Sequence, residues 1–305
     1  MIPGASIVGD GLPGSTIPAL TKLRYGRKAY PAHGAQTSGM PARLPCWLKG
    51  VKLHWQPWRI SALDDRRIEM NDRMARIILL LLAVAFAISP FFSNGFGGFY
   101  RESFPVQVDR WPAQPVGWAF SIWGAIYLGL ILAATWALWR PATMPAWGRA
   151  IWPLGVSLLI GVFWVETAMR SPLLATIMIL VMTTGAIIAM LHTHSNWREW
   201  GPLGLYAGWL TAASGVAVSV VATGYGILSS QVAAIALIAC VLVVAIAVSA
   251  ARAHIGTYRA GVIWALFGVI ITNLAAGDWL IVTLCSTGIV VLGFFDRFIK
   301  TSSHR

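Results

Sequence analysis

The chain has 305 residues, of which 57% are hydrophobic and 11% charged. A soluble domain carries roughly 25% charged residues, so this composition excludes an ordinary soluble protein and indicates one that spans a membrane. The formal net charge of +12 is high enough for nucleic-acid binding. The basic residues flank apolar runs and form no basic face, however, so we expect the lipid bilayer as a partner and no nucleic acid.

The first 69 residues differ from the rest of the chain. They mix Pro, Gly, Ser, Trp and Arg without periodicity and lack the charged start, apolar core and cleavage site of a signal peptide. Met70 and Met74 directly precede the first apolar run, and each would suit a start residue. We interpret residues 1–69 as a disordered cytoplasmic tail or as the product of a start codon assigned too early, and we favour the second interpretation.

Eight apolar runs follow, most of them close to the 20 residues that a helix needs to cross a hydrocarbon core roughly 30 Å thick. Each run must be helical, because backbone polar groups in hydrocarbon are satisfied only within the protein. We therefore expect an all-α integral membrane protein of about eight transmembrane helices. The runs cover residues 75–92, 117–139, 150–169, 172–193, 202–223, 230–250, 260–275 and 277–295.

The basic residues between the runs predict the orientation. With the N-terminus inside, eight fall on the cytoplasmic side, before the addition of Arg73 and Arg76, and three fall on the opposite side. This bias predicts that both termini are cytoplasmic, which requires an even number of spans. The inner set is Arg140, Arg149, Arg198, Arg252, Arg259, Arg297, Lys300 and Arg305, and the outer set is Arg101, Arg110 and Arg170.

Tryptophan is unusually frequent: only Trp47, Trp55 and Trp58 of the 16 precede Met74, which leaves 13 in the membrane part. An aromatic belt at the two membrane boundaries accounts for most of them. Four are predicted to lie deeper in the membrane, at positions 123, 164, 209 and 264. The outer belt would hold Trp111, Trp118 and Trp279, and the inner belt Trp136, Trp139, Trp147, Trp152, Trp197 and Trp200.

Three of the deep rings have companions at helical spacing, on faces that combine aromatic with small residues. Flat rings beside small side chains would suit a slot for a flat apolar ligand. Ordinary ring packing in a helix bundle gives the same periodicity, so both interpretations stay open on this pattern alone. The faces are Phe120, Trp123 and Tyr127; Ser157, Gly161 and Trp164; and Tyr206, Trp209 and Ala213.

The segment Pro115–Tyr127, PVGWAFSIWGAIY, resembles the signature that opens the second helix of the TspO/MBR family of tryptophan-rich sensory proteins. Several aromatics, a Gly and a Pro are in register with that signature. The segment also follows one helix and a longer loop, residues 93–116, which in the family folds over the mouth of a ligand cavity.

The resemblance extends over residues 74–225. Residues 153–190 resemble the third and fourth helices of the family, and Leu205–Ala213 resembles the aromatic stretch of its fifth helix. It implies a TspO-like five-helix bundle over residues 70–225, followed by three additional transmembrane helices and a short tail over residues 226–305. The family binds porphyrins and, in some members, sterols or synthetic ligands, and it forms homodimers, so a homodimer is a candidate assembly here.

The candidate ligand-binding residues combine the matching family positions with the motif and face residues. Two departures make the expected cavity less polar than is usual in the family: Ser157 and Gly161 stand where Gln and Asn are common, and Ala217 replaces an Asn. This weakens the expectation that porphyrin carboxylates are recognised there. The candidates are Pro115, Trp118, Phe120, Trp123, Tyr127, Trp164, Tyr206, Trp209 and Ala213.

Few other polar residues lie in the spans. Glu166 is the only carboxylate well inside one, and Arg170 four residues later favours an interfacial ion pair. His192 and His194 do not share a helical face and are interpreted as surface residues rather than haem ligands. Capping or turn roles suffice for Asn273 and Asp278.

Two small-residue features complete the inventory. Gly204, Gly208 and Ala212 form a small-xxx-small seam that suits close helix contact within the chain or in a dimer. The three cysteines, at positions 46, 240 and 285, have no metal-ligand spacing, so we predict no metal site.

The leading hypothesis is a ligand-binding, sensor-like receptor in the membrane, which holds a porphyrin, another tetrapyrrole or a similar flat apolar molecule. Two alternatives remain: a small-molecule transporter that uses all eight helices, and light- or oxygen-dependent porphyrin breakdown in which Trp123 and Trp209 react. The sequence has no recognisable catalytic constellation, which disfavours an enzyme, and no cofactor is required. The helical spans point to a bacterial inner membrane.

Overall fold

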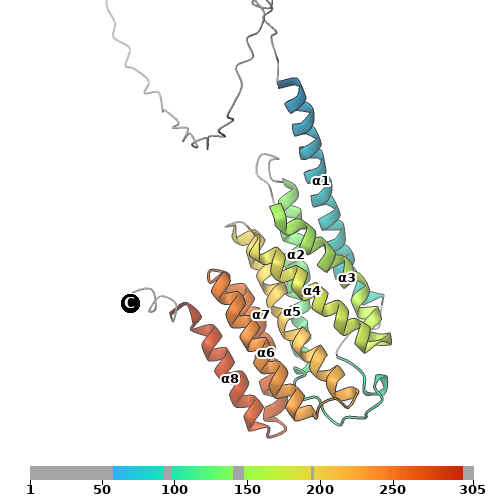
Figure 1. Ribbon diagram of the computed structural model, residues 1–305, viewed down its shortest axis with the longest axis vertical. Helices are drawn as coiled ribbons and strands as arrows, with labels where there is room; N and C mark the ends of the chain where they lie inside the picture. The colour runs from blue at the N-terminus through green and yellow to red at the C-terminus, as the bar shows by residue number, and fades with distance from the viewer. Residues whose placement is uncertain (1–57, 93–97, 140–147, 194–195, 298–305) are drawn as a thin grey trace, which may run out of the picture. The chain divides into compact units, whose positions relative to one another are not determined.

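The computed structural model describes residues 58–92, 98–139, 148–193 and 196–297, with side chains from Asp72 onward. The predictions for residues 1–57, Arg140, Trp147, His194, Lys300 and Arg305 therefore lie outside the described residues. Within the described part the chain forms eight α-helices joined by loops and short 3₁₀ turns, without strands (Figure 1). The helices are α1 Trp58–Ile88, α2 Ile122–Trp139, α3 Ile151–Arg170, α4 Pro172–Leu191, α5 Trp197–Gly224, α6 Ser230–Ala251, α7 Gly256–Leu274 and α8 Trp279–Gly293.

The expected all-α membrane fold is confirmed. Among the described residues, seven helices are long and apolar enough to cross a membrane, and α8 is apolar but has only 15 residues. The span that contains α2 begins with the 3₁₀ turn η4, Gly117–Ser121, which carries the first half of the aromatic signature.

The α3–α4 junction shows how local sequence ends one span and starts the next. Ser171 has an extended backbone conformation, and its side chain accepts a hydrogen bond from the backbone N–H of Leu174 at 3.4 Å. Pro172 follows at the first helical position, where its missing N–H leaves no bond unmade. The two helices consequently form a tight hairpin.

Three helices begin four or more residues before their apolar runs, among them α7, which begins at Gly256 rather than near residue 260. Helix α1 begins at Trp58, inside the segment interpreted as a tail or as the product of an early start codon, and α5 begins at Trp197 rather than near residue 202. Residues 58–71 contain no Gly or Pro, so a helix that starts in the membrane extends through them at little cost. At α5, the side chain of Asn196 accepts a hydrogen bond from the N–H of Arg198 at 3.0 Å and caps the polar first turn.

Helix α5 lies at the centre of the bundle and contacts α2, α4, α6 and α7. Its predicted glycine seam is used within the chain. A Cβ at Gly208 would collide with the backbone carbonyl of Tyr258 in α7, and one at Gly261 of α7 would lie 2.7 Å from the backbone nitrogen of Trp209. The two helix backbones therefore approach as closely as small residues allow.

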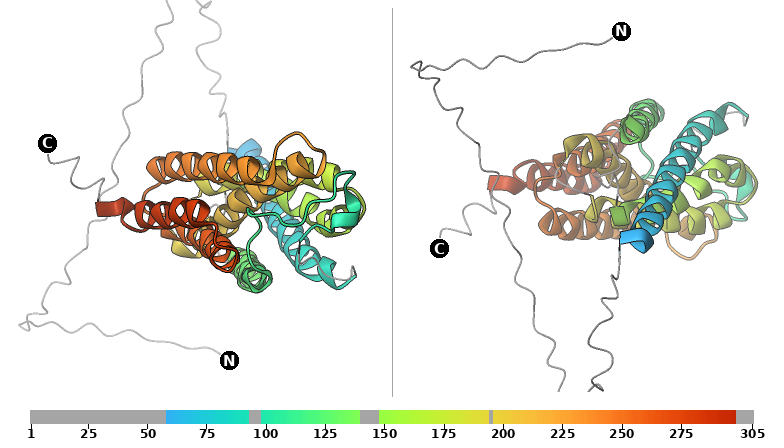
Figure 2. Two further views of the ribbon diagram at one scale, coloured as in Figure 1. Left: turned by 90° about the horizontal axis from the view of Figure 1, so that it is seen from below. Right: turned by 90° about the horizontal axis from the view of Figure 1, so that it is seen from above.

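The last three helices are continuous with the others. The described residues from Trp58 onward belong to one compact unit, and α7 packs along α5 as extensively as α3 packs along α4. Helix α8 lies at the edge of the bundle against α6 and α7, away from α3 and α4 (Figure 2). The predicted boundary at residue 225 thus falls between helices of a single unit.

Candidate functional site

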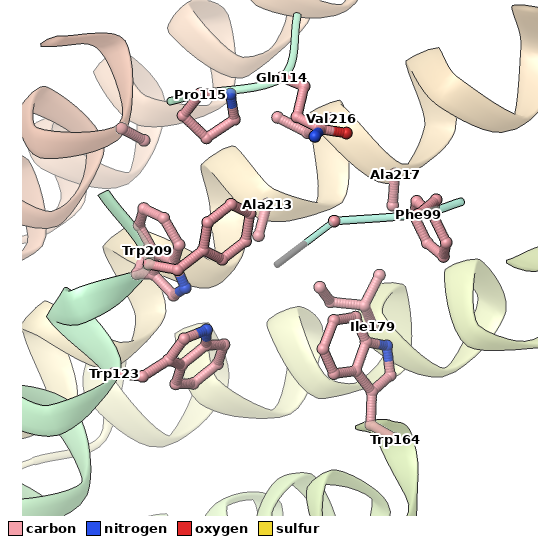
Figure 3. Close-up of a pocket in the computed structure, with 13 residues that line it drawn as sticks. Phe99, Gln114, Pro115, Trp123, Trp164, Ile179, Trp209, Ala213, Val216 and Ala217 are labelled. Atoms are coloured by element: carbon pink, nitrogen blue, oxygen red, sulfur yellow. The ribbon is translucent and has the colours of Figure 1, made fainter. Parts of the chain in front are cut away.

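One pocket brings together residues from five helices and from the loop that precedes α2 (Figure 3). Six of the nine candidate residues line it: Pro115, Phe120, Trp123, Trp164, Trp209 and Ala213. The pocket is also lined by Gly98, Phe99, Gln114, Ile179, Val216, Ala217 and Ala265, which were not among the candidates.

Trp123 and Trp209 form one wall. Their ring centroids are 6.1 Å apart with planes at 85°, and Phe120 meets the Trp209 ring edge-on at 5.8 Å. Edge-to-face pairs of this kind hold rings at fixed angles and stabilise the arrangement by about 0.5–1.5 kcal/mol beyond simple burial. These rings are therefore a rigid surface against which a flat molecule can lie.

Trp164 forms part of the opposite wall, beside Ile179 (Figure 3). Its indole N–H donates a hydrogen bond to the backbone carbonyl of Ala175 at 2.9 Å, which ties α3 to α4 and fixes the orientation of the ring. The Trp164 ring therefore offers the pocket its apolar surface and not its polar edge.

Three candidates lie away from the pocket lining. Trp118 is 46% exposed and packs edge-on against Trp264, with ring centroids 5.5 Å apart. Tyr127 stacks on Trp123 at 5.4 Å with planes at 19°, and Tyr206 is fully buried, with its hydroxyl 2.9 Å from that of Ser157. The two tyrosines support the pocket rings from behind, whereas Trp118 lies in η4 and packs against Trp264 of α7.

The predicted face of Ser157, Gly161 and Trp164 contributes only Trp164 to the pocket. A Cβ at Gly161 would lie 2.6–3.0 Å from the ring of Phe86 in α1, so this glycine leaves room for that ring. Phe86 in turn meets Trp123, Tyr127 and Tyr206 at centroid distances of 5.7, 5.0 and 6.0 Å. The space that a larger residue at 161 would fill is occupied by Phe86, which the sequence did not single out.

Two polar atoms in the pocket residues have no hydrogen-bond partner in the described structure: Nε1 of Trp209 and Oε1 of Gln114. Both atoms are buried, and Trp209 is only 1% exposed. Buried polar groups are nearly always satisfied in proteins, so a pocket with one orphan donor and one orphan acceptor is suited to a ligand that carries the complementary groups.

The pocket is small and uncharged. The space between the lining side chains is about 30 Å³, enough for roughly one or two water molecules. None of the described lining residues carries a charge. A ligand of ordinary size needs roughly 300–1,000 Å³, so the pocket walls must move apart to admit one.

The remaining polar residues are placed as follows. Glu166 is half exposed and pairs with Arg170 at 2.5 Å, the predicted ion pair on one helix. Nδ1 of His192 lies 2.8 Å from the carbonyl of Ile188 at the end of α4. Asn273 and Asp278 do more than the predicted turn role, because both bind Arg110 of the loop before α2. Among the described residues, no group of three or more His, Cys, Asp or Glu could hold a metal ion.

A family model described as TSPO-like protein matches residues 76–296, more than two thirds of the chain. The match extends from the membrane part of α1 to beyond the end of α8, so it includes the three helices after residue 225. Neither the curated proteins nor the solved structures gave a match to the chain.

Proposed function

The chain belongs to the TSPO-like protein family, and on this basis we propose that it is a ligand-binding, sensor-like protein of the membrane. Its ligand is a porphyrin, another tetrapyrrole or a similar flat apolar molecule, held in the pocket described above. The observation that carries the proposal is the convergence of Trp123, Trp164 and Trp209, from three helices, on one pocket. Tryptophans that served only as an aromatic belt would face lipid at the membrane boundary and would not converge on one pocket.

The orphan polar atoms refine the ligand chemistry. The N–H of Trp209 needs an acceptor, and Oε1 of Gln114 needs a donor. A tetrapyrrole ring carries both pyrrole N–H groups and unprotonated ring nitrogens. Because no charged side chain lines the pocket among the described residues, the carboxylates of a porphyrin would have to remain at the aqueous mouth.

Binding requires a wider pocket than the present one. A ligand that fits only the open form shifts the population toward that form by its differential affinity. The loop residues Gly98, Phe99, Gln114 and Pro115 are the part of the lining that does not belong to a transmembrane helix, and we propose that they move. Because the loop residues must move before the ligand enters, the association rate constant should lie well below the diffusion limit.

The alternative is a small-molecule transporter, and buried hydroxyl pairs between helices favour it. Thr183 and Ser214 lie 2.6 Å apart across α4 and α5, and Thr211 and Tyr258 lie 3.2 Å apart across α5 and α7. Thr183 and Thr211 also donate to the backbone carbonyls of Leu210 and Ala207, and no charged side chain takes part in these bonds. Because these hydroxyls already bond within the protein, they support a transport pathway less than the aromatic pocket supports a receptor.

The proposed location is a bacterial inner membrane with both termini in the cytoplasm, because basic residues concentrate on that side. Labelling of single cysteines at positions 101 and 252, each introduced after the three native cysteines have been replaced, with an impermeant reagent on intact cells tests the orientation. Label at position 101 and not at 252 is the expected result, and the reverse pattern would contradict the orientation.

The binding test is tryptophan-fluorescence quenching of the full chain, titrated with protoporphyrin IX. A Trp123→Ala/Trp209→Ala variant removes the pocket wall, and a Trp118→Ala/Trp279→Ala variant removes two exposed rings as a matched control. Saturable, stoichiometric quenching that the first variant loses and the second keeps would support the proposal. Non-saturating quenching in all three proteins would indicate partitioning into detergent and would contradict it.

A further inference from the structure

The segment of residues 110–119, called the rim segment below, comprises the end of the loop before α2 and the first residues of η4. It supplies Gln114 and Pro115 to the pocket and is bonded to the last two helices. The fastening lies at the outer ends of α7 and α8 and involves Asn273 and Asp278. Helices α7 and α8 come after residues 74–225, the segment that the sequence resemblance covers. Their contact with the rim segment therefore gives them a role at the pocket that the resemblance does not predict.

Asn273 is the centre of this contact. Its side chain is fully buried, and its Nδ2 donates to the backbone carbonyl of Pro112 at 2.7 Å and to that of Val269 at 2.8 Å. Its Oδ1 accepts a hydrogen bond from Nη1 of Arg110 at 3.2 Å. Arg110 also forms an ion pair with Asp278, so two residues of the rim segment are held by the α7–α8 turn.

The turn itself does not need the Asn273 side chain. The backbone carbonyl of Asn273 accepts the hydrogen bonds of the turn, from the N–H groups of Ala276 at 3.2 Å and Asp278 at 3.1 Å. A buried amide near the end of a membrane helix is costly unless all its groups are bonded. Here the side-chain bonds beyond its own helix all go to the rim segment.

Further down α7 the contact continues to the pocket. The N–H of Val116 donates to the carbonyl of Gly268 at 3.2 Å, and the indole N–H of Trp264 donates to the carbonyl of Ala119 at 2.8 Å. A Cβ at Gly268 would lie 2.8 Å from that of Pro115, so this glycine lets the rim segment lie directly on the helix. Ala265, one turn away, lines the pocket.

We propose that Asn273 is a positioning residue, which holds the rim segment against α7 so that Gln114 and Pro115 close the pocket. The last helices thereby set how readily the pocket opens and how fast a ligand is exchanged. The exchange half of this inference rests on the proposed function, because it requires that the pocket takes a ligand. The positioning half is independent of any ligand.

Hydrogen exchange of the full chain, followed by mass spectrometry without ligand, tests the positioning half. Asn273→Leu removes the bonds to Pro112 and Arg110, so exchange in peptides from residues 110–119 should accelerate about tenfold. Thr272→Val is the matched control, since the Thr272 hydroxyl donates to the carbonyl of Gly268 in its own helix, and the N–H of Val116 keeps that acceptor when the hydroxyl is removed. Unchanged exchange of the rim segment in Asn273→Leu would overturn the proposal.

A second variant separates positioning from loss of fold. If Asn273→Leu also accelerates exchange in the middle of α7, then Arg110→Gln decides, because Arg110 lies in the loop and not in the helix. Faster exchange of the rim segment with an unchanged α7 supports the proposal. An unchanged rim segment in Arg110→Gln rejects it.

Stopped-flow mixing with protoporphyrin IX tests the exchange half. The expected result is that association and dissociation both become several-fold faster in Asn273→Leu and stay as in the parent chain in Thr272→Val. A loosened rim segment with unchanged rates would overturn the proposed control of exchange. If the parent chain binds no protoporphyrin IX, the proposed function is rejected but the positioning half is not. Hydrogen exchange then still decides whether Asn273 positions the rim segment.

Discussion

The indole ring of Trp209 lies edge-on to that of Trp123, at a centroid distance of 6.1 Å, and its N–H is buried without a partner among the described residues. Neighbouring aromatic rings fix the orientation of the Trp209 ring, while its N–H remains available to a hydrogen-bond acceptor on a ligand. A buried N–H in that condition costs roughly 1–3 kcal/mol. A ligand acceptor would remove this cost, and the first prediction follows from that.

Trp209→Phe keeps an aromatic ring but removes the N–H. A lost hydrogen bond of this kind is expected to weaken binding by roughly 0.5–1.5 kcal/mol, or about two- to tenfold in Kd. The measurement is an absorbance titration of the porphyrin band, which does not depend on tryptophan as the reporter. Equal Kd values for the parent chain and Trp209→Phe would show that the N–H does not contact the ligand.

Ala213→Leu places a larger side chain in the pocket, whose space is only about 30 Å³. Protoporphyrin IX binding should fall at least about tenfold, because the inserted side chain and the ligand compete for the same volume. Ala236→Leu, at an exposed position of α6, is the control and should bind as the parent does. Normal binding by Ala213→Leu would place the ligand elsewhere.

Gly261→Ala tests the α5–α7 crossing that carries Trp209 and Ala265. The new Cβ would lie 2.7 Å from the backbone nitrogen of Trp209, so the helices must separate, at a cost of about 1–3 kcal/mol. Gly124→Ala is the control: nothing lies within 4 Å of its added Cβ, and the change should leave stability equal or raise it by up to about 1 kcal/mol. Thermal unfolding in the same detergent compares the two. A Tm for Gly261→Ala equal to that of the parent would contradict the close crossing.

Glu166→Gln tests whether the intramembrane carboxylate has a functional role. The Glu166–Arg170 pair is exposed at both partners, and exposed pairs contribute only about 0–1 kcal/mol. We therefore expect protoporphyrin IX affinity and Tm close to those of the parent chain. A large loss of binding would instead make Glu166 part of the ligand pathway and would favour the transporter alternative.

The helices and the pocket rings could be predicted from the sequence for different reasons. Hydropathy alone locates α2 to α8, because a span must be apolar over its length. Helical spacing and the signature segment predict Trp123 and Trp209 as ligand-site residues. Helix α1 before residue 72 escaped prediction, since its polar first half has no apolar period.

The other pocket residues depend on contacts between distant elements. Phe86 fills the space beside Gly161, but this complementarity is visible only when the orientations of α1 and α3 are known. Gln114 and Ala265 both line the pocket because the rim segment lies on α7. Bonds from the Asn273 side chain hold the rim segment there, and no sequence periodicity predicts these bonds. For Asn273 the sequence predicts only a capping or turn role.

The most direct test of the central claim is ¹⁹F NMR of the full chain with 5-fluorotryptophan, assigned by single substitutions, before and after addition of protoporphyrin IX. The ring current of a bound porphyrin shifts nearby fluorine signals strongly. We predict saturable shifts for Trp123, Trp164 and Trp209, with little change at the exposed Trp118 and Trp279. Shifts confined to Trp118 and Trp279, or shifts that grow without saturation, would contradict a ligand site in this pocket.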